Sequence, residues 1–158
     1  SVGHTSLPPS RLEPQLARLD RLFGPGEAAR HPVLDQTERE LAEFFSGRRH
    51  HFDVPLVIRG TAFQERVWRA LLDIPFGGTT SYGALAEQLG IRNGQRAVGL
   101  ANGSNPIAII VPCHRVIARD GGLCGYGGGI DRKRFLLALE QRGIDPLAST
   151  PLGAAALG

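Results

Sequence analysis

Apolar residues recur at three- and four-residue steps along much of this chain, which predicts a protein built mainly from short helices. Leucines at such steps predict a first helix over residues 11–23. A second helix is predicted to begin near Asp35, which forms a capping-box pattern with Glu38, and to end at Gly47. The residues expected on its apolar face are Leu34, Leu41, Phe44 and Phe45.

Three helices with sharper boundaries are predicted next. Thr61 and Gln64 form a second capping box at the start of the first of them. The residues expected on its buried side are Phe63, Val67, Trp68, Leu71 and Ile74. A short helix over residues 81–89, a turn over 91–94 and a helix from Gln95 then have the spacing of a helix-turn-helix unit.

Two apolar runs predict strands. The first covers residues 54–58, where Pro55 favours an edge position, and the second, over residues 107–111, is expected to be fully buried. After a glycine-rich loop, a last helix is predicted to be capped by Asp131. Many helices with few strands indicate an α+β fold.

Composition and charge narrow the function classes. The 158 residues are 42% hydrophobic, which excludes global disorder, and no apolar run approaches the about 20 residues that span a bilayer. With two cysteines and no secretion signal, we expect a reduced, cytoplasmic setting. The net charge of +3 divides into −1 for residues 1–53 and +4 for residues 54–158. In the last helix, the first-turn cations Arg132, Lys133 and Arg134 oppose the helix dipole, and an anion such as phosphate would relieve them.

The candidate chemistry centres on Cys113. A thiol with a pKa of about 8.5 needs a base or positive potential to act as a nucleophile at neutral pH. Groups that would help are the base His114, the cations Arg96 and Arg115, and the orienting carboxylate Glu140. Neighbouring side chains on an extended segment point apart, so His114 would need a tight turn or a bridging water to reach the thiol. The alternative is that Cys113 is a small buried hydrophobic residue and His114 a surface residue.

An ordered string of motifs resembles the O6-alkylguanine-DNA alkyltransferases, also called methylated-DNA–protein-cysteine methyltransferases. The resemblance runs from about Phe52 to Gly143. The motifs that carry it are Phe63-Gln64, Val67-Trp68, Ile74-Pro75, Ser81-Tyr82, Arg96-Ala97-Val98-Gly99, Asn105-Pro106, Pro112-Cys113-His114-Arg115-Val116, Gly125-Tyr126 and Lys133 to Glu140.

The resemblance implies direct-reversal DNA repair without a cofactor. Cys113 would accept an alkyl group from O6 of guanine, irreversibly, so that each molecule acts once. His114 would take the thiol proton through a water, Glu140 would orient the imidazole, and Asn105 would act as a hinge. We expect a monomer, and cooperative binding on DNA stays open.

The resemblance also implies how double-stranded DNA is bound. The damaged nucleotide would be flipped out of the duplex, with Arg96 inserted in its place and the helix-turn-helix in the minor groove. Tyr82 would contact the phosphate and donate a proton toward the guanine ring. The remaining residues expected to contact DNA are Gln95, Ala97 and Arg115, and those expected in the substrate pocket are Tyr126, Gly127 and Val116.

The family implies a ribonuclease-H-like amino-terminal lobe, a mainly helical carboxy-terminal lobe and a winged-helix-like helix-turn-helix. Residues 1–53 lack alternating strands, so we expect a reduced or rearranged lobe over 1–58. An alkyl-acceptor domain is predicted over 59–143 and a mobile tail over 144–158. No metal is expected, because the histidines before Cys113 have no cysteine partner.

Two other functions fit parts of the pattern. A cysteine hydrolase would use Cys113, His114 and Glu140 through an acyl-enzyme, but a helix-turn-helix just before the cysteine argues against it. A DNA-binding damage sensor would not need the thiol, so the presence of Cys113 argues against that interpretation.

Overall fold

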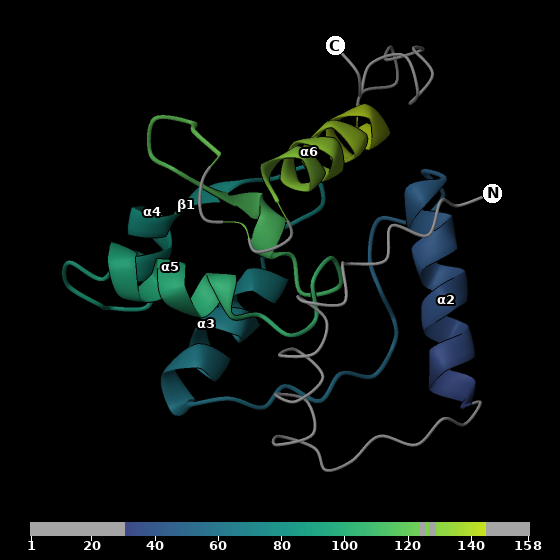
Figure 1. Ribbon diagram of the computed structural model, residues 1–158, viewed down its shortest axis with the longest axis horizontal. Coiled ribbons are helices and arrows are strands. Elements are labelled where there is room, and N and C mark those ends of the chain that lie inside the picture. Colours follow the sequence, from purple (N-terminus) through teal and green to yellow (C-terminus); the bar gives the residue numbers. More distant parts are fainter. Residues whose placement is uncertain (1–30, 124–125, 127–128, 145–158) are drawn as a thin grey trace. The chain divides into compact units, whose positions relative to one another are not determined.

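The structure, a computed structural model, describes residues 31–123, 126 and 129–144 (Figure 1). The chain divides into two units after Arg30, and everything below concerns the second. Its elements are α2 (Pro32–Phe45), α3 (Ala62–Leu72), β1 (Thr80–Ser81), α4 (Tyr82–Gln88), α5 (Gln95–Gly103), the 3-10 helix η1 (Cys113–Arg115), β2 (Val116–Ile117) and α6 (Ile130–Ile144). The helix predicted over 11–23 and residues 145–158 of the predicted tail lie outside the described residues.

α2 begins earlier than its predicted cap. His31 is the N-cap, and its Nδ1 accepts a hydrogen bond from the backbone N–H of Val33 at 3.1 Å. Pro32 occupies the first turn, where the missing N–H costs nothing, so Asp35 lies inside the helix instead of capping it. The predicted end is confirmed at Gly47, whose φ of +79° favours glycine. On the predicted apolar face Phe44 is buried but Leu34 is exposed.

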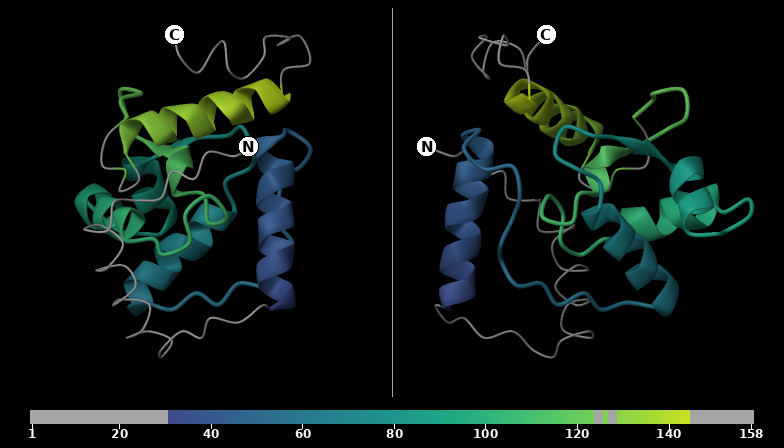
Figure 2. Two further views of the ribbon diagram at one scale, coloured as in Figure 1. Left: turned by 45° about the vertical axis from the view of Figure 1, so that its right-hand side comes forward. Right: turned by 180° about the vertical axis from the view of Figure 1, so that it is seen from behind.

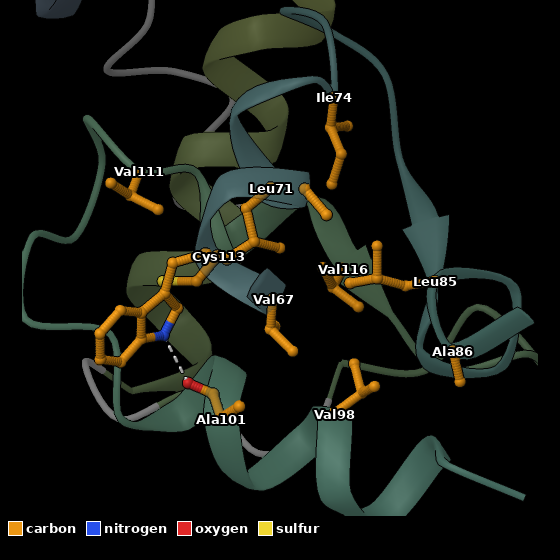
Figure 3. Packing of buried hydrophobic residues seen from close by; sticks show 12 residues of the cluster. Val67, Leu71, Ile74, Leu85, Ala86, Val98, Ala101, Val111, Cys113 and Val116 are labelled. Atoms are coloured by element: carbon orange, nitrogen blue, oxygen red, sulfur yellow. Dashed lines mark hydrogen bonds between the residues drawn. The ribbon is translucent and has the colours of Figure 1, made fainter. Parts of the chain in front are cut away.

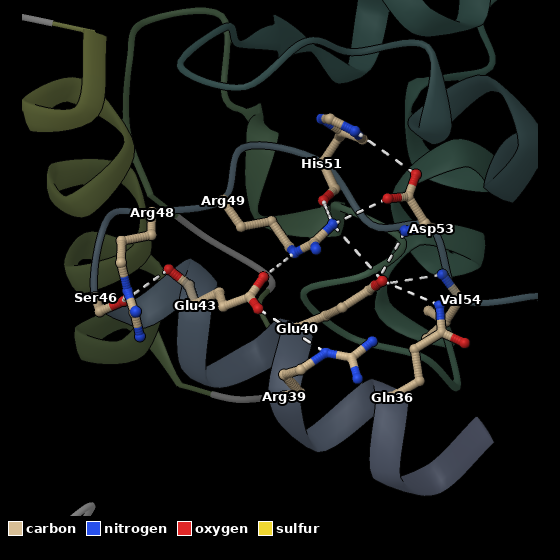
Figure 4. Close-up of polar contacts among 10 residues, drawn as sticks. All are labelled: Gln36, Arg39, Glu40, Glu43, Ser46, Arg48, Arg49, His51, Asp53 and Val54. Carbon is tan, nitrogen blue, oxygen red and sulfur yellow. Dashed lines mark hydrogen bonds and ion pairs between the residues drawn. The ribbon is translucent and has the colours of Figure 1, made fainter. Parts of the chain in front are cut away.

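The predicted strand over residues 54–58 does not form. A strand needs a neighbour for its backbone groups, and here the N–H groups of Asp53 and Val54 donate instead to Glu40 Oε2, at 3.0 and 3.3 Å (Figure 4). Arg49 also lies against Glu40, with 3.6 Å between Nη1 and Oε1. Burial raises the pKa of Glu40, but the hydrogen bonds from Gln36 and this backbone, with Arg49, hold it below its ordinary value.

α3, α4 and α5 form where the sequence predicts them (Figure 2). The capping box is present: the Gln64 N–H donates to Thr61 Oγ1 at 3.1 Å, and the Thr61 N–H donates to Gln64 Oε1 at 3.0 Å. Ser81 caps α4 through a bond from the Ala84 N–H. α4 and α5 pack against each other, joined by a turn that includes Asn93 at a φ of +53°.

One buried cluster joins α3 and α5 to the segment before β2 (Figure 3). Trp68 is fully buried, as predicted, and its Nε1 donates to the carbonyl of Ala101 at 2.8 Å. β1 and β2 pair in parallel, with Thr80 opposite Val116. Since a parallel pair needs a crossover, α4 and α5 lie in the connection between the two strands. The described residues are therefore α+β, as predicted.

The predicted buried strand over residues 107–111 is a turn. Ile109 has a φ of +75°, the Val111 N–H donates to the Ile107 carbonyl at 3.0 Å, and of this run only Val111 is buried. Asn105 sets the local geometry: its Oδ1 accepts from the Ile107 N–H at 2.9 Å and its Nδ2 donates to the Val111 carbonyl at 2.8 Å. These side-chain bonds replace the ladder that a strand would need.

α2 shares a core with the end of the chain that the structure describes. Phe44 of α2 lies in one buried cluster with Leu136 and Leu139 of α6, which Phe52 and Phe76 partly cover. The predicted domain 59–143 and the helix before it thus share one core. None of the described helices combines the length and apolar character that a bilayer span requires.

Replacing Glu40 tests the bond that holds residues 53 and 54. In Glu40→Ala the buried N–H of Val54 and the part-buried N–H of Asp53 lose their acceptor, so we expect the free energy of unfolding at pH 7 to fall by about 1–3 kcal/mol. Because the folded-state pKa of Glu40 is lowered, its contribution is complete above the unfolded carboxyl pKa of about 4.3 and is lost as the pH falls through the folded-state pKa. Denaturant titrations at neutral and acidic pH measure both effects.

The matched control is Glu38→Ala on the exposed side of the same helix, expected to change the free energy of unfolding by less than about 0.5 kcal/mol. Equal losses in the two variants would contradict the assignment of Glu40.

Candidate active site

Cys113 begins η1 directly after Pro112 and is 5% exposed. This 3-10 turn supplies the tight turn that the sequence required between Cys113 and its neighbour His114. Asn102 of α5, which sequence reasoning missed, donates from Nδ2 to the Cys113 carbonyl at 3.3 Å. The sequence signal that could have revealed Asn102 is its spacing, four residues after Val98, which puts both on the same face of the helix. Both residues are buried in the structure.

The surroundings of the Cys113 sulfur affect the pKa of its thiol in opposite directions. Burial raises the pKa of the thiol, while the Asn105 side chain, the backbone N–H of Cys113, the Lys133 cation and the Tyr126 hydroxyl lower it, and the net pKa lies above the ordinary value. Burial and the neighbouring Cys113 also raise the pKa of Tyr126, so its hydroxyl stays protonated and serves as a donor. The site can solvate a thiolate, but a base must first remove the proton.

The structure brings His114 and Glu140 together, as the sequence predicted. His114 Nε2 lies 2.7 Å from Glu140 Oε1, and both side chains are buried. Burial raises the pKa of Glu140, but the hydrogen bonds and charges of His114 and Arg115 hold it below its ordinary value. An ionised carboxylate only accepts, so Nε2 carries the hydrogen, and in the neutral ring Nδ1 then has the lone pair. Nδ1 is buried and has no hydrogen-bond partner in the part of the chain that the structure describes.

Arg115 does not lie where a DNA contact would. The residue is 7% exposed, its Nη2 donates to Glu140 Oε1 at 2.8 Å, and its Nη1 donates to the carbonyl of Ile74 at 2.6 Å. A buried carboxylate and a carbonyl hold the Arg115 guanidinium inside the protein, which does not favour the predicted contact with DNA.

The sequence groups Lys133 with Arg132 and Arg134 as first-turn cations that an anion would relieve, but its surroundings differ from theirs. It is fully buried, its Nζ donates to the Val116 carbonyl, and it lies 5.8 Å from the centre of the Tyr82 ring and 5.9 Å from that of Tyr126. Arg132 and Arg134 are exposed. The spacing could have shown this, since Lys133 lies three and seven residues before the inward-facing Leu136 and Glu140.

The remaining predicted residues differ in their exposure to solvent. Tyr82, the first residue of α4, is half-buried near Lys133, and Gln95, Arg96 and Ala97 are exposed in the first turn of α5. Val116 was predicted to line the substrate pocket, but its side chain lies fully in the core and only its carbonyl is used, by Lys133. Gly127 lies outside the described residues. Among the residues described, no cluster of three or more His, Cys, Asp and Glu side chains is placed to hold a metal ion.

Comparisons with known proteins agree with this arrangement. A family model described as 6-O-methylguanine DNA methyltransferase, DNA binding domain, matches residues 62–142. Relatives named methylated-DNA–protein-cysteine methyltransferase include one from Mycobacterium tuberculosis, 63% identical over 102 residues, and one from Mycobacterium leprae, 48% identical over 132 residues. The first match covers 65% of this chain and 62% of the relative, and the second covers 82% and 80%. The chain thus spans less than two thirds of the length of the tuberculosis relative.

Solved structures give the same result. The crystal structure of Mycobacterium tuberculosis OGT in complex with DNA is 57% identical, with a TM-score of 0.68 over 71% of this chain and 70% of that one. An O6-methylguanine-DNA methyltransferase from Pyrococcus kodakaraensis is 30% identical, with a TM-score of 0.61 over 83% and 77%. Fold and site define a protein with a buried cysteine, set at the start of a 3-10 turn, and a pair of packed helices. The chain belongs to the 6-O-methylguanine DNA methyltransferase family.

Lys133→Met tests the cation beside the sulfur. Because the Lys133 charge lowers the pKa of the Cys113 thiol, its removal should raise that pKa and slow alkylation of Cys113 at neutral pH by about tenfold, the effect typical of a nearby buried charge. Thiolate absorbance and the rate of reaction with iodoacetamide, each followed against pH, measure the change. Arg134→Met, an exposed charge on the same helix, is the control, and an equal slowing there would contradict a local effect.

Proposed function

We propose that this protein repairs DNA by transferring an alkyl group from O6 of guanine to Sγ of Cys113, in one irreversible turnover. The observation that carries the proposal is the buried Cys113 surrounded by thiolate-stabilising donors, next to His114 on the same short turn, which is paired with Glu140 of α6. The names of the relatives and the matching DNA-binding family model support the same reaction class.

The reaction balances with groups that the site contains. The Cys113 thiol proton passes, through a water, to Nδ1 of His114, and the resulting imidazolium is stabilised by Glu140, 2.7 Å from Nε2. The thiolate attacks the alkyl carbon, so that an S–C bond forms as the C–O6 bond breaks. Guanine leaves with the bonding electrons, and the half-buried Tyr82 hydroxyl donates a proton toward the ring so that the base departs neutral. The thioether is stable, so each molecule reacts once.

DNA binding is proposed through the first turn of α5. Gln95, Arg96 and Ala97 are exposed there, and the relative from Mycobacterium tuberculosis has been solved with DNA. A thiol cannot reach guanine O6 inside a duplex, so the nucleotide must be flipped out, at a cost of a few kcal/mol. Arg96 would fill the vacated space from the minor groove, where the degenerate base pattern allows binding with little regard to sequence.

A stoichiometry experiment tests the transfer. Incubated with excess duplex containing O6-methylguanine, the protein should gain the mass of one methyl group, on the peptide that contains Cys113, and then stop. Cys113→Ser should keep its affinity for DNA and lose the transfer. Continued turnover, as a cysteine hydrolase would show, or a methyl group on another residue would contradict the proposal.

The role of Arg96 is tested by Arg96→Ala. Loss of an inserted side chain should weaken transfer from duplex DNA by about 1–3 kcal/mol, or roughly 5- to 150-fold, and leave the reaction with free O6-benzylguanine base unchanged, since the base needs no flipping. Single-turnover rates on the two substrates measure this. Arg69→Ala, an exposed arginine on α3, is the charge-matched control. Equal losses in both variants would indicate a general charge effect and no insertion.

A further inference from the structure

Arg115 is the second side chain that holds Glu140. Its Nε donates to Oε1 and Oε2 at 3.1 and 3.0 Å, and its Nη2 donates to Oε1 at 2.8 Å. The forked guanidinium therefore spans both carboxylate oxygens and fixes the plane of the carboxylate. At the same time Nη1 donates to the carbonyl of Ile74, which anchors the guanidinium to the segment after α3.

Two segments, η1 and the loop after α3, donate to this one carboxylate of α6. His114 and Arg115 come from η1, and the backbone N–H of Gly77, in the loop after α3, donates to Oε2 at 3.2 Å. Among the described residues, the charged or titratable groups against Glu140 are Arg115 and His114. The Phe76 ring lies 5.9 Å from Arg115 Cζ.

We propose that Arg115 is a positioning residue, which keeps Glu140 an acceptor of fixed orientation and thereby leaves Nδ1 of His114 free to accept the thiol proton. This role rests on the proposed alkyl transfer and assigns to the arginine of the Pro-Cys-His-Arg motif a function inside the protein. The guanidinium acts through Glu140 and His114 and touches neither the sulfur nor the substrate.

The alternative state of the pair explains why the arginine matters. If Glu140 were protonated, its hydroxyl would donate to Nε2 and the imidazole hydrogen would move to Nδ1. Nδ1 would then have no lone pair for the thiol proton, and no carboxylate charge would stabilise the imidazolium. Burial favours that protonated state, because it raises the pKa of Glu140, and Arg115 opposes it by charge and by hydrogen bonding.

Two variants separate charge from shape. Arg115→Met removes both, and Arg115→Lys keeps the charge without the fork. In the Met variant the pKa of Glu140 should rise, so the acid limb of the alkylation rate should move to higher pH, with a loss about tenfold larger at pH 6 than at pH 8. The Lys variant should react more slowly than the parent but keep its pH profile. The rate is measured with free O6-benzylguanine, alongside DNA affinity and denaturant unfolding.

The outcomes separate this role from a purely structural one. A rate that falls by the same factor at every pH would overturn the proposal, and so would reduced DNA affinity with an unchanged rate on the free base. Nitrogen NMR of His114 in the unmodified protein gives a test that needs no variant: the hydrogen should be on Nε2 at neutral pH, and a hydrogen on Nδ1 would overturn the proposal. If the parent protein failed to transfer an alkyl group, the proposed function would fall, and the NMR result would still decide the tautomer.

Discussion

The buried carboxylate of Glu140 joins the parts of the molecule that must cooperate. It lies on α6, accepts from His114 and Arg115 on η1, and accepts from the backbone N–H of Gly77 after α3. A lone carboxylate in such a place would be protonated, because burial penalises its charge. The donors that keep it ionised are the same groups that fix the chain around the cysteine. Folding and the acid–base chemistry of the site therefore depend on one set of bonds.

The pKa of the Cys113 thiol is also set by burial acting against neighbouring donors, but here burial has the larger effect. For Glu140 the donors outweigh burial, whereas for Cys113 burial outweighs Asn105, Lys133 and Tyr126, so the pKa of the thiol lies above its ordinary value. A raised pKa favours the thiol over the more reactive thiolate, and the surrounding donors lower the pKa and so favour the thiolate. Such a balance would suit the proposed single reaction of the cysteine, because oxidation before that reaction would inactivate the whole molecule.

Local signals in the sequence predicted the helices well and the site in part. The helix caps formed by Thr61 with Gln64 and by Ser81 bind backbone groups a few residues away. The start of each helix therefore depends on little else in the chain. The two predicted strands were wrong because a strand needs a distant partner. At the start of residues 54–58 the carboxylate of Glu40 binds the N–H groups of Asp53 and Val54, and the amide of Asn105 binds the two ends of residues 107–111. Apolar runs alone do not reveal that a side chain will bind these backbone groups in place of a neighbouring strand.

The positions of the long cationic side chains were also hard to predict, because they too depend on partners that are distant in the sequence. Lys133 and Arg115 carry charges that composition assigns to the surface, and only the positions of Val116, Glu140 and Ile74 in space show that each has a buried acceptor. The sequence indicates Cys113, His114 and Glu140 because a motif string carries them in order. The structure brings two of them, His114 and Glu140, into contact across 26 residues.

α5 connects the surface proposed to meet DNA with the segment that carries the nucleophile. Its outer first turn exposes Arg96, while its inner face holds the Ala101 carbonyl against Trp68 and the Asn102 amide against the Cys113 carbonyl. One turn further, Asn105 clamps the segment that leads to Pro112. Because a rigid helix with fixed bonds at its inner face does not bend independently of its outer face, the position of Arg96 and that of Cys113 are set together. An extruded base guided by α5 would therefore arrive at a sulfur whose place the same helix determines.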